Sequence, residues 1–170
     1  MRLSAGLGLF LLAATCFHAA STGPAHAELQ RWSVLYLDAN GNPTTYAGRK
    51  SAEAYATNQA GYVLSIGCAP GGGHSIAAQA PEGEKADFGG PEVEPSFRVS
   101  KPGTDLFLGP IGKMTFDGER YTGLLPDEAV APLRERIKDG LVTWTEFTSR
   151  TTIAVRSQRA DGALGELNCK

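Results

Sequence analysis

The stretch YVLSIGCAPGGGHSIAAQ, residues 62–79, decides the fold that we predict for this chain. It holds two short runs typical of strands, Tyr62–Ile66 and His74–Gln79, separated by Cys68 and a loop rich in Pro and Gly. Similar runs continue in both directions, with turn residues about every 8–12 positions. About eight to ten such strands predict a mainly β domain, built as an antiparallel β-sandwich or a barrel-like sheet.

Turn residues divide the rest of the chain into further strands. An Asn-Gly pair at Asn40-Gly41 and an Asp-Gly pair at Asp117-Gly118 are strong hairpin signals. The remaining predicted strands are Trp32–Leu37, Ser51–Thr57, Phe97–Ser100, Asp105–Leu108, Ile111–Phe116, Glu119–Leu124, Leu141–Thr148 and Thr151–Arg156.

Two short helices complete the prediction. One begins near Pro126 and carries Val130, Leu133 and Ile137 on one face, with Pro132 as the alternative first position of a shorter helix. The other covers Ala160–Asn168 and lies at the C-terminus of the chain.

Residues 1–27 are predicted to be a secretory signal peptide. Arg2 precedes an apolar run over Leu3–Phe17, and Ala25-His26-Ala27 is a small-x-small cleavage pattern before Glu28. A lipoprotein acylated at Cys16 is the alternative, but Ala13 and Thr15 stand where lipoproteins usually carry Leu and a small residue. We therefore expect a single β-rich domain over residues 28–170, periplasmic or secreted, with no transmembrane segment after signal removal.

Cys68 and Cys169 are the two cysteines that remain after signal removal. In an oxidising compartment an even count is most simply explained by one disulfide bond. The terminal helix would deliver Cys169 to Cys68, and the bond would be a structural staple, because no C-x-x-C spacing points to redox chemistry.

The composition excludes several classes of function. The net charge of −2 becomes −3 without Arg2, so the chain has no basic footprint for nucleic acid. Of the three histidines only His74 follows the signal peptide, which is too few for a structural zinc site, and no G-x-S-x-G elbow accompanies it. We predict no catalytic residue, no cofactor and no metal ion.

Two acidic positions suggest metal binding or catalysis, and each has a simpler interpretation. Asp38, Asn40 and Asn42 have the spacing of the first calcium ligands of an EF-hand loop, but Pro43 and Arg49 break the pattern, and a hairpin turn explains the same residues. Glu146 is the one acid inside a strongly apolar strand. Its pKa would rise if it were buried, but we expect it to face solvent on an alternating strand.

The segment Ala80–Pro95 is predicted to be an exposed loop. It is rich in Gly and Pro and has no periodicity, and five carboxylates there oppose the single Lys85. Such a loop must face water or a basic partner. Together with His74 these carboxylates form the candidate partner surface, which consists of His74, Glu82, Glu84, Asp87, Glu92 and Glu94.

The layout of the chain resembles two families of small exported proteins, the invasion-associated locus B family and the periplasmic accessory proteins of type VI secretion. The matching pieces are Trp32, the strand Leu64–Cys68, the strand Thr151–Arg156 and the terminal Gly162–Cys169. The Leu-Pro-Leu-Gly stretch of the first family is replaced here by LGPIG at residues 108–112. The resemblance implies a β-sandwich and an envelope compartment, and it transfers no catalytic residue.

The sequence thus favours an exported, non-enzymatic protein that binds a protein or envelope partner through its loops. The alternative is a small hydrolase or carbohydrate-active enzyme that uses a pair of carboxylates.

Overall fold

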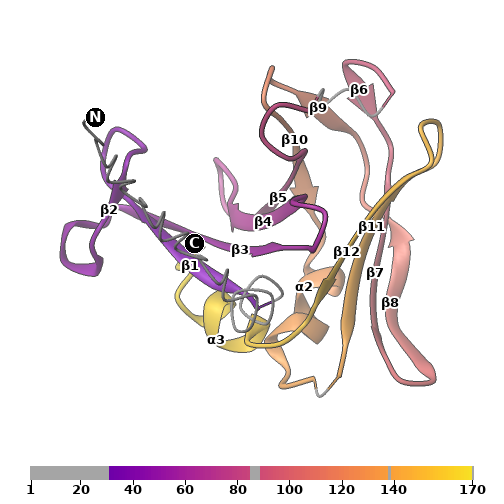
Figure 1. Ribbon diagram of the computed structural model, residues 1–170. Helices are drawn as coiled ribbons and strands as arrows, with labels where there is room; N and C mark the ends of the chain where they lie inside the picture. Colours follow the sequence, from indigo (N-terminus) through magenta and orange to yellow (C-terminus); the bar gives the residue numbers. More distant parts are fainter. Residues whose placement is uncertain (1–30, 85–88, 138, 170) are drawn as a thin grey trace, which may run out of the picture.

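The computed structural model describes residues 31–84, 89–137 and 139–169. Their strands form two antiparallel sheets, one of eight strands and one of four, with two α-helices beside them (Figure 1). The predicted mainly β fold is confirmed, and within these residues the strands make two separate sheets instead of one closed barrel. The predicted signal peptide lies outside the described residues.

The larger sheet contains residues 62–79, on which the fold prediction was built. β4 and β5 pair in register around the Gly-rich loop, with Cys68 directly opposite His74. The sheet order is β2 (Pro43–Thr44), β1 (Ser33–Leu37), β3 (Ser51–Thr57), β4 (Val63–Cys68), β5 (His74–Gln79), β10 (Arg120–Leu125), β9 (Met114–Phe116) and β6 (Glu92–Val93).

The smaller sheet comes from the second half of the chain. Its order is β12 (Thr151–Arg156), β11 (Leu141–Glu146), β7 (Ser96–Lys101) and β8 (Thr104–Pro110). Alternate residues of β7 and β11 are buried, which is the pattern of strands with one face on a core and one on solvent.

The core lies between the inner faces of the two sheets. Trp144 and Phe97 from the smaller sheet and Tyr121 from the larger sheet are among its largest fully buried side chains. The indole Nε1 of Trp144 donates a hydrogen bond to the sulfur of Met114 at 3.2 Å, which joins β11 to β9 across the core. The core therefore fixes both sheets as one scaffold.

The helices differ in detail from the prediction. α2 spans Asp127–Arg134, so Pro132 lies inside the helix, not at its first position, and Ile137 lies beyond its end. Asp127 and Glu128 sit in the first turn of α2, where negative charge is favourable, and the helix ends two residues after the proline. α3 spans Ala160–Gly165, which is shorter than predicted.

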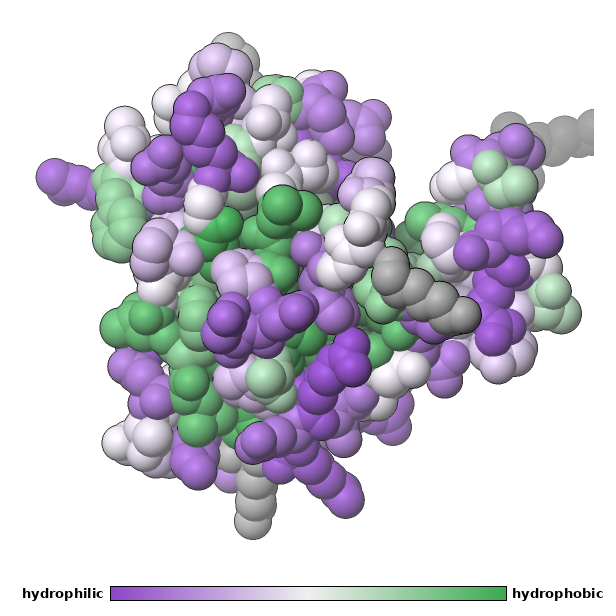
Figure 2. Space-filling view, turned by 180° about the vertical axis from the view of Figure 1, so that it is seen from behind, coloured by the Kyte–Doolittle hydropathy of each residue, from purple (hydrophilic) through white to green (hydrophobic). Residues whose placement is uncertain are grey.

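One end of the larger sheet projects from the body. We call this part the arm; it consists of β1, the turn at residues 38–42, β2 and the 3-10 helix η1 (Tyr46–Gly48). No residue of β1, β2 or η1 is buried. Seen from behind, the arm stands away from the body and its surface is mostly hydrophilic (Figure 2).

Within the described ranges, no helix is both long and apolar enough to span a bilayer.

Candidate functional site

The predicted disulfide is present. Cys68 at the end of β4 is bonded to Cys169, which follows α3, and their Cα atoms are 4.9 Å apart. The bond closes a separation of 101 residues and ties the C-terminal helix to the middle of the larger sheet.

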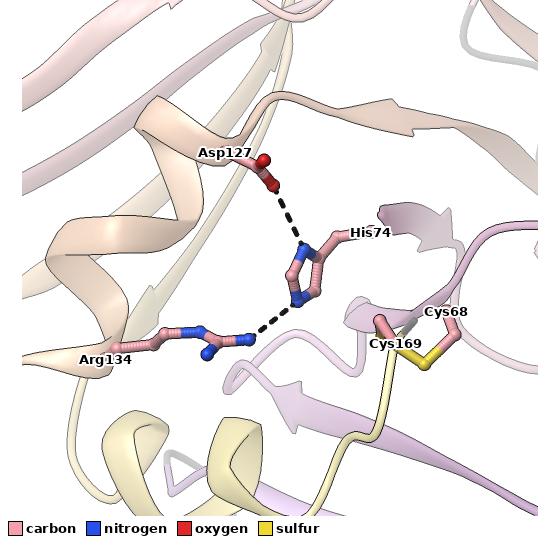
Figure 3. The surroundings of a disulfide bond; sticks show 5 residues. All are labelled: Cys68, His74, Asp127, Arg134 and Cys169. Atoms are coloured by element: carbon pink, nitrogen blue, oxygen red, sulfur yellow. Dashed lines mark hydrogen bonds and ion pairs between the residues drawn. A yellow bond between two sulfur atoms is a disulfide. The ribbon is translucent and has the colours of Figure 1, made fainter. Parts of the chain in front are cut away.

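His74 lies beside the disulfide and bridges the two ends of α2 (Figure 3). The Arg134 guanidinium lies 3.0 Å from His74 Nε2, and Asp127 Oδ1 lies 3.4 Å from His74 Nδ1. Because a guanidinium can only donate, Nε2 accepts this hydrogen bond and the ring proton sits on Nδ1, facing Asp127. The Nδ1–Asp127 distance of 3.4 Å is long for a hydrogen bond, and Nδ1 has no hydrogen-bond partner among the described residues.

This cluster is a structural contact. The nitrogen that would act as a general base is occupied by Arg134, and the neighbouring sulfurs are joined to each other. His74 is 8% exposed, so it is set apart from the exposed carboxylates with which the sequence grouped it.

The acidic part of the candidate partner surface is exposed where the structure describes it. Glu82, Glu84, Glu92 and Glu94 are all exposed, and Asp87 lies outside the described residues. Lys113 donates to Glu92 at 3.1 Å, and this hydrogen bond raises the pKa of Lys113. Glu84 accepts a hydrogen bond from the Tyr62 hydroxyl at 3.5 Å, so two of the predicted carboxylates already have partners.

The prediction that Ala80–Pro95 is an exposed loop throughout is wrong at its C-terminal part. Glu92 and Val93 form β6, which pairs with β9, and Val93 is buried. The Tyr121 hydroxyl donates to the Gly90 carbonyl at 2.5 Å. The apolar Val93 and this buried hydroxyl hold the segment to the sheet edge in spite of its acidic composition.

Glu146 is buried, which overturns the expectation that it faces solvent. It is 3% exposed, and its two carboxylate oxygens accept hydrogen bonds from the amides of Thr148 and Ser149, at 2.8 and 2.6 Å, and from the Ser149 hydroxyl at 2.7 Å. Burial alone would raise the pKa of Glu146, but the bonds from Ser149 and Thr148 together outweigh it, and the pKa is lowered. An ionised Glu146 that fastens the β11–β12 turn is unsuited to act as a general acid.

The Asp38 turn is a hairpin turn, as the sequence analysis favoured. One oxygen of Asp38 accepts hydrogen bonds from the amides of Asn40 and Asn42, at 2.8 and 2.9 Å. The backbone amide of Asn42, followed by that of Asn40, lowers the pKa of Asp38. Among the described residues no group of three or more His, Cys, Asp or Glu is placed to hold a metal ion.

The site that sequence reasoning missed is a groove along the inner face of the arm. It has an open volume of about 1600 Å³, and its lining includes Trp32, Val34 and Tyr36 together with Arg136, Arg156 and Arg159. We call this feature the groove. The residues come from three separate parts of the chain, so no local motif could have revealed it.

The charges in the groove are unevenly engaged. The pKa of Tyr36 is raised, by burial first and then by the negative charge of Glu166. In the part of the chain that the structure describes, no ion pair or hydrogen bond engages the side chains of Arg136, Arg156 or Arg159. Asp139, Asp161 and Glu166 line the same groove, so it presents three guanidiniums and three carboxylates to a ligand.

Two further features mark the groove as unusual. The indole Nε1 of Trp32 is buried and has no hydrogen-bond partner within residues 31–84, 89–137 and 139–169. Asp139 and Arg159, which both line the groove, have φ angles of 56° and 67°, in the left-handed region that favours glycine. Unfavourable backbone conformations of this kind gather at functional sites more often than elsewhere.

Comparisons of the chain with family models, curated proteins and solved structures find no match.

Proposed function

We propose that this is an exported protein of the cell envelope that holds a protein partner in the groove and catalyses no reaction. The observation that carries the proposal is the groove itself, an open volume of about 1600 Å³ lined by two aromatic residues, three arginines and three carboxylates, with no ion pair among the described residues engaging these charges. Guanidiniums recognise carboxylates through forked pairs of hydrogen bonds, and aromatic residues and Arg dominate the energetics of protein interfaces. The groove offers both kinds of contact on one surface.

Export is supported by the signal-peptide pattern of residues 1–27 and by the Cys68–Cys169 disulfide, which suits an oxidising compartment. Sequencing the N-terminus of the exported protein tests this part of the proposal. We expect Glu28 as the first residue. A membrane-bound product acylated at Cys16 would contradict it.

The binding surface is tested by capture from an envelope extract with two matched variants. The groove variant replaces Arg136, Arg156 and Arg159 by Gln, and the acidic variant replaces Glu82, Glu84 and Glu94 by Gln. All six positions are exposed, so both variants should fold like the wild type. We expect the groove variant to lose the captured protein by about tenfold or more, since three charge-assisted contacts are removed, and the acidic variant to keep it.

Two results would contradict the proposal. Loss of capture by the acidic variant alone would show that the partner binds the acidic segment and not the groove. Turnover of a sugar, ester or peptide substrate by the purified protein, abolished by one substitution, would favour an enzyme that uses carboxylates.

A further inference from the structure

Asn40 lies in the turn that joins β1 to β2, and a glycine follows it directly. Both Asn40 and Gly41 are exposed, on the arm that stands away from the body (Figure 2). In the part of the chain that the structure describes, no hydrogen bond engages the side-chain amide of Asn40. A Cβ atom added to Gly41, which has a φ of +80°, would meet no described atom within 4 Å. The Asn40 side chain and the backbone after it are therefore both accessible to water.

The hydrogen bonds of this turn hold its backbone around Asp38. Asp38 Oδ1 accepts from the amides of Asn40 and Asn42 at 2.8 and 2.9 Å, and the Asp38 amide donates to the Asn42 carbonyl at 2.9 Å. The Gly41 amide donates to the Asp38 carbonyl at 3.2 Å, which is the longest of these bonds. Hydrogen bonds of an exposed turn open more easily than those of a buried strand. The Gly41 nitrogen is thus held by the weakest contact of the turn.

We propose that Asn40 is a site of spontaneous covalent modification, in which the Gly41 nitrogen attacks the Asn40 side chain and water completes its conversion to aspartate or isoaspartate. Hydroxide removes the Gly41 amide proton, and a bond forms from this nitrogen to Cγ of Asn40. The Cγ–Nδ2 bond breaks, and Nδ2 takes a proton from water and leaves as ammonia, which closes a succinimide ring and restores the hydroxide. Water then opens the ring at Cγ, which gives aspartate, or at the main-chain carbonyl, which gives isoaspartate. Glycine favours the closure because it has no Cβ to hinder the attack.

The other asparagines of the described residues are less suited to this reaction. Asn42 precedes Pro43, whose nitrogen carries no proton, so the ring cannot form there. The side-chain oxygen of Asn58 accepts two backbone hydrogen bonds, each at 3.0 Å, which hold the side chain in place. Asn168 precedes Cys169, which has a side chain and is fixed by the disulfide. The structure therefore selects Asn40.

The two products have different effects on the arm. Both place a second carboxylate near that of Asp38. Isoaspartate also adds a carbon atom to the backbone between residue 40 and Gly41. Asp38 Oδ1 binds amides on both sides of this link, and β2 pairs with β1 through only Tyr36↔Thr44 and Leu37↔Pro43. A lengthened turn therefore loosens β2, whereas aspartate leaves the register intact.

The modification is tested by following peptide masses from the full mature protein, incubated at mildly alkaline pH either folded or unfolded in guanidinium chloride. Trypsin cleaves after Arg31 and Arg49, and the peptide between them carries Asn40. The peptide that carries Asn58 is the internal reference. In the folded sample we expect the first peptide to gain the mass difference between an amide and an acid, and the second to keep its mass. Asn40→Gln, which would need a larger ring, is the matched control and should abolish the gain.

Hydrogen exchange tests the expected effect on β2. The isoaspartate form is separated by chromatography from the aged protein. Asn40→Asp carries the added charge on a backbone of normal length and is its control. We expect the Asn42 amide to exchange faster in the isoaspartate form than in Asn40→Asp, because the lengthened backbone takes this amide away from Asp38.

Three results would contradict the inference. A mass gain in the unfolded sample alone would show that the turn protects Asn40, and equal gains in the two peptides of the folded protein would show that the structure does not select it. A gain that persists in Asn40→Gln would place the reaction at another residue. Equal exchange of the isoaspartate form and Asn40→Asp would overturn the loosening of β2. None of these results depends on a partner in the groove, so they are distinct from the tests of the proposed function.

Discussion

β4 and β1 belong to the same sheet and have similar compositions, yet they are in very different environments. Residues 64–67 of β4 are all buried, whereas β1 has no buried residue. β4 has β3 and β5 as neighbours, and α3 is tied to its end by the disulfide. β1 has a full partner on one side only. The position of a strand in the sheet therefore decides whether its apolar residues make a core or line a groove.

Arginines show the same contrast. In the body, Arg134 donates to His74, and Arg120 reaches Glu53 with Nη1 3.0 and 3.3 Å from the two carboxylate oxygens. In the groove, Arg136, Arg156 and Arg159 are not engaged by described residues. The body uses its charges to join its own elements, and the groove leaves them available.

Shortening one leucine in each strand is the strongest test of the contrast between β4 and β1. Leu64→Ala in β4 should cost about 3–5 kcal/mol of unfolding free energy, because Leu64 is fully buried and its removal leaves a cavity. Leu35→Ala in β1 should cost within about 1 kcal/mol, since Leu35 is only partly buried. Urea unfolding measures both. Equal losses would mean that the arm is part of the cooperative core.

Removing the disulfide should have the next largest effect. Cys68→Ser should lower the unfolding free energy by about 2–4 kcal/mol, because the bond restricts the unfolded chain over a long separation. Thermal unfolding of Cys68→Ser, Cys169→Ser and the double variant provides the measurement and its control. The three variants should be equally destabilised. Two alkylatable thiols in the unreduced native protein would contradict the presence of the disulfide.

Glu146 and Glu92 allow the comparison to be extended to carboxylates, one buried and one exposed. Because the folded state holds the pKa of Glu146 below its ordinary value, ionised Glu146 adds stability above that value, and this contribution is lost as the pH falls through the folded pKa. Glu146→Gln should therefore cost about 1–3 kcal/mol at neutral pH, and the gap to the wild type should close in acid.

Glu92→Gln is the matched control for this pH dependence. Glu92 is exposed and paired with Lys113, so its loss should change stability by less than about 1 kcal/mol at any pH. A gap between Glu146→Gln and the wild type that persists unchanged in acid would show that shape, not charge, holds the β11–β12 turn.

The sequence was a good guide to the fold because its strands are bounded by turn chemistry. Ser51–Thr57, His74–Gln79 and Thr151–Arg156 have the predicted bounds, and the Cys68–Cys169 bond is the one predicted. Errors arose where tertiary contacts decide. Val93 joins the sheet through β9, which is distant in sequence, and Glu146 is buried because the following turn supplies its donors.

The groove could not be predicted because nothing local signals it. In the sequence, Trp32 and Tyr36 look like ordinary strand residues. Arg136, Arg156 and Arg159 look like ordinary charged surface residues. Only the packing of β1 beside α3 and the loops around residues 136–140 and 156–159 brings them together. Arg159, which directly precedes α3, has a positive φ angle. This could not help to predict the groove, because a positive φ at a non-glycine residue cannot be inferred from a sequence.

The segment that leads to β6 provides a smaller test, because one part of it is exposed and the other is held by the body. Tyr121→Phe removes the hydrogen bond to the Gly90 carbonyl and should cost about 1 kcal/mol. Glu84→Gln, in the exposed part, should change the stability by less than about 0.5 kcal/mol. Chemical denaturation distinguishes the two. A neutral Tyr121→Phe would mean that Val93 alone holds the segment.

The expected change in stability at Arg159 is also small, and its sign is informative. A non-glycine residue in the left-handed region is disfavoured by about 1–2 kcal/mol, while glycine adds about 0.5–1 kcal/mol of unfolded-state entropy. Arg159→Gly should thus leave the stability unchanged or raise it by about 1 kcal/mol, while it removes a groove arginine and weakens capture of the envelope partner. Arg156→Gly, within β12, is the control that should lose both stability and binding. Denaturation and capture from the envelope extract, on the same samples, measure the pair. A clear loss of stability in Arg159→Gly would show that the Arg159 side chain supports the fold, and the unfavourable backbone there would no longer point to binding.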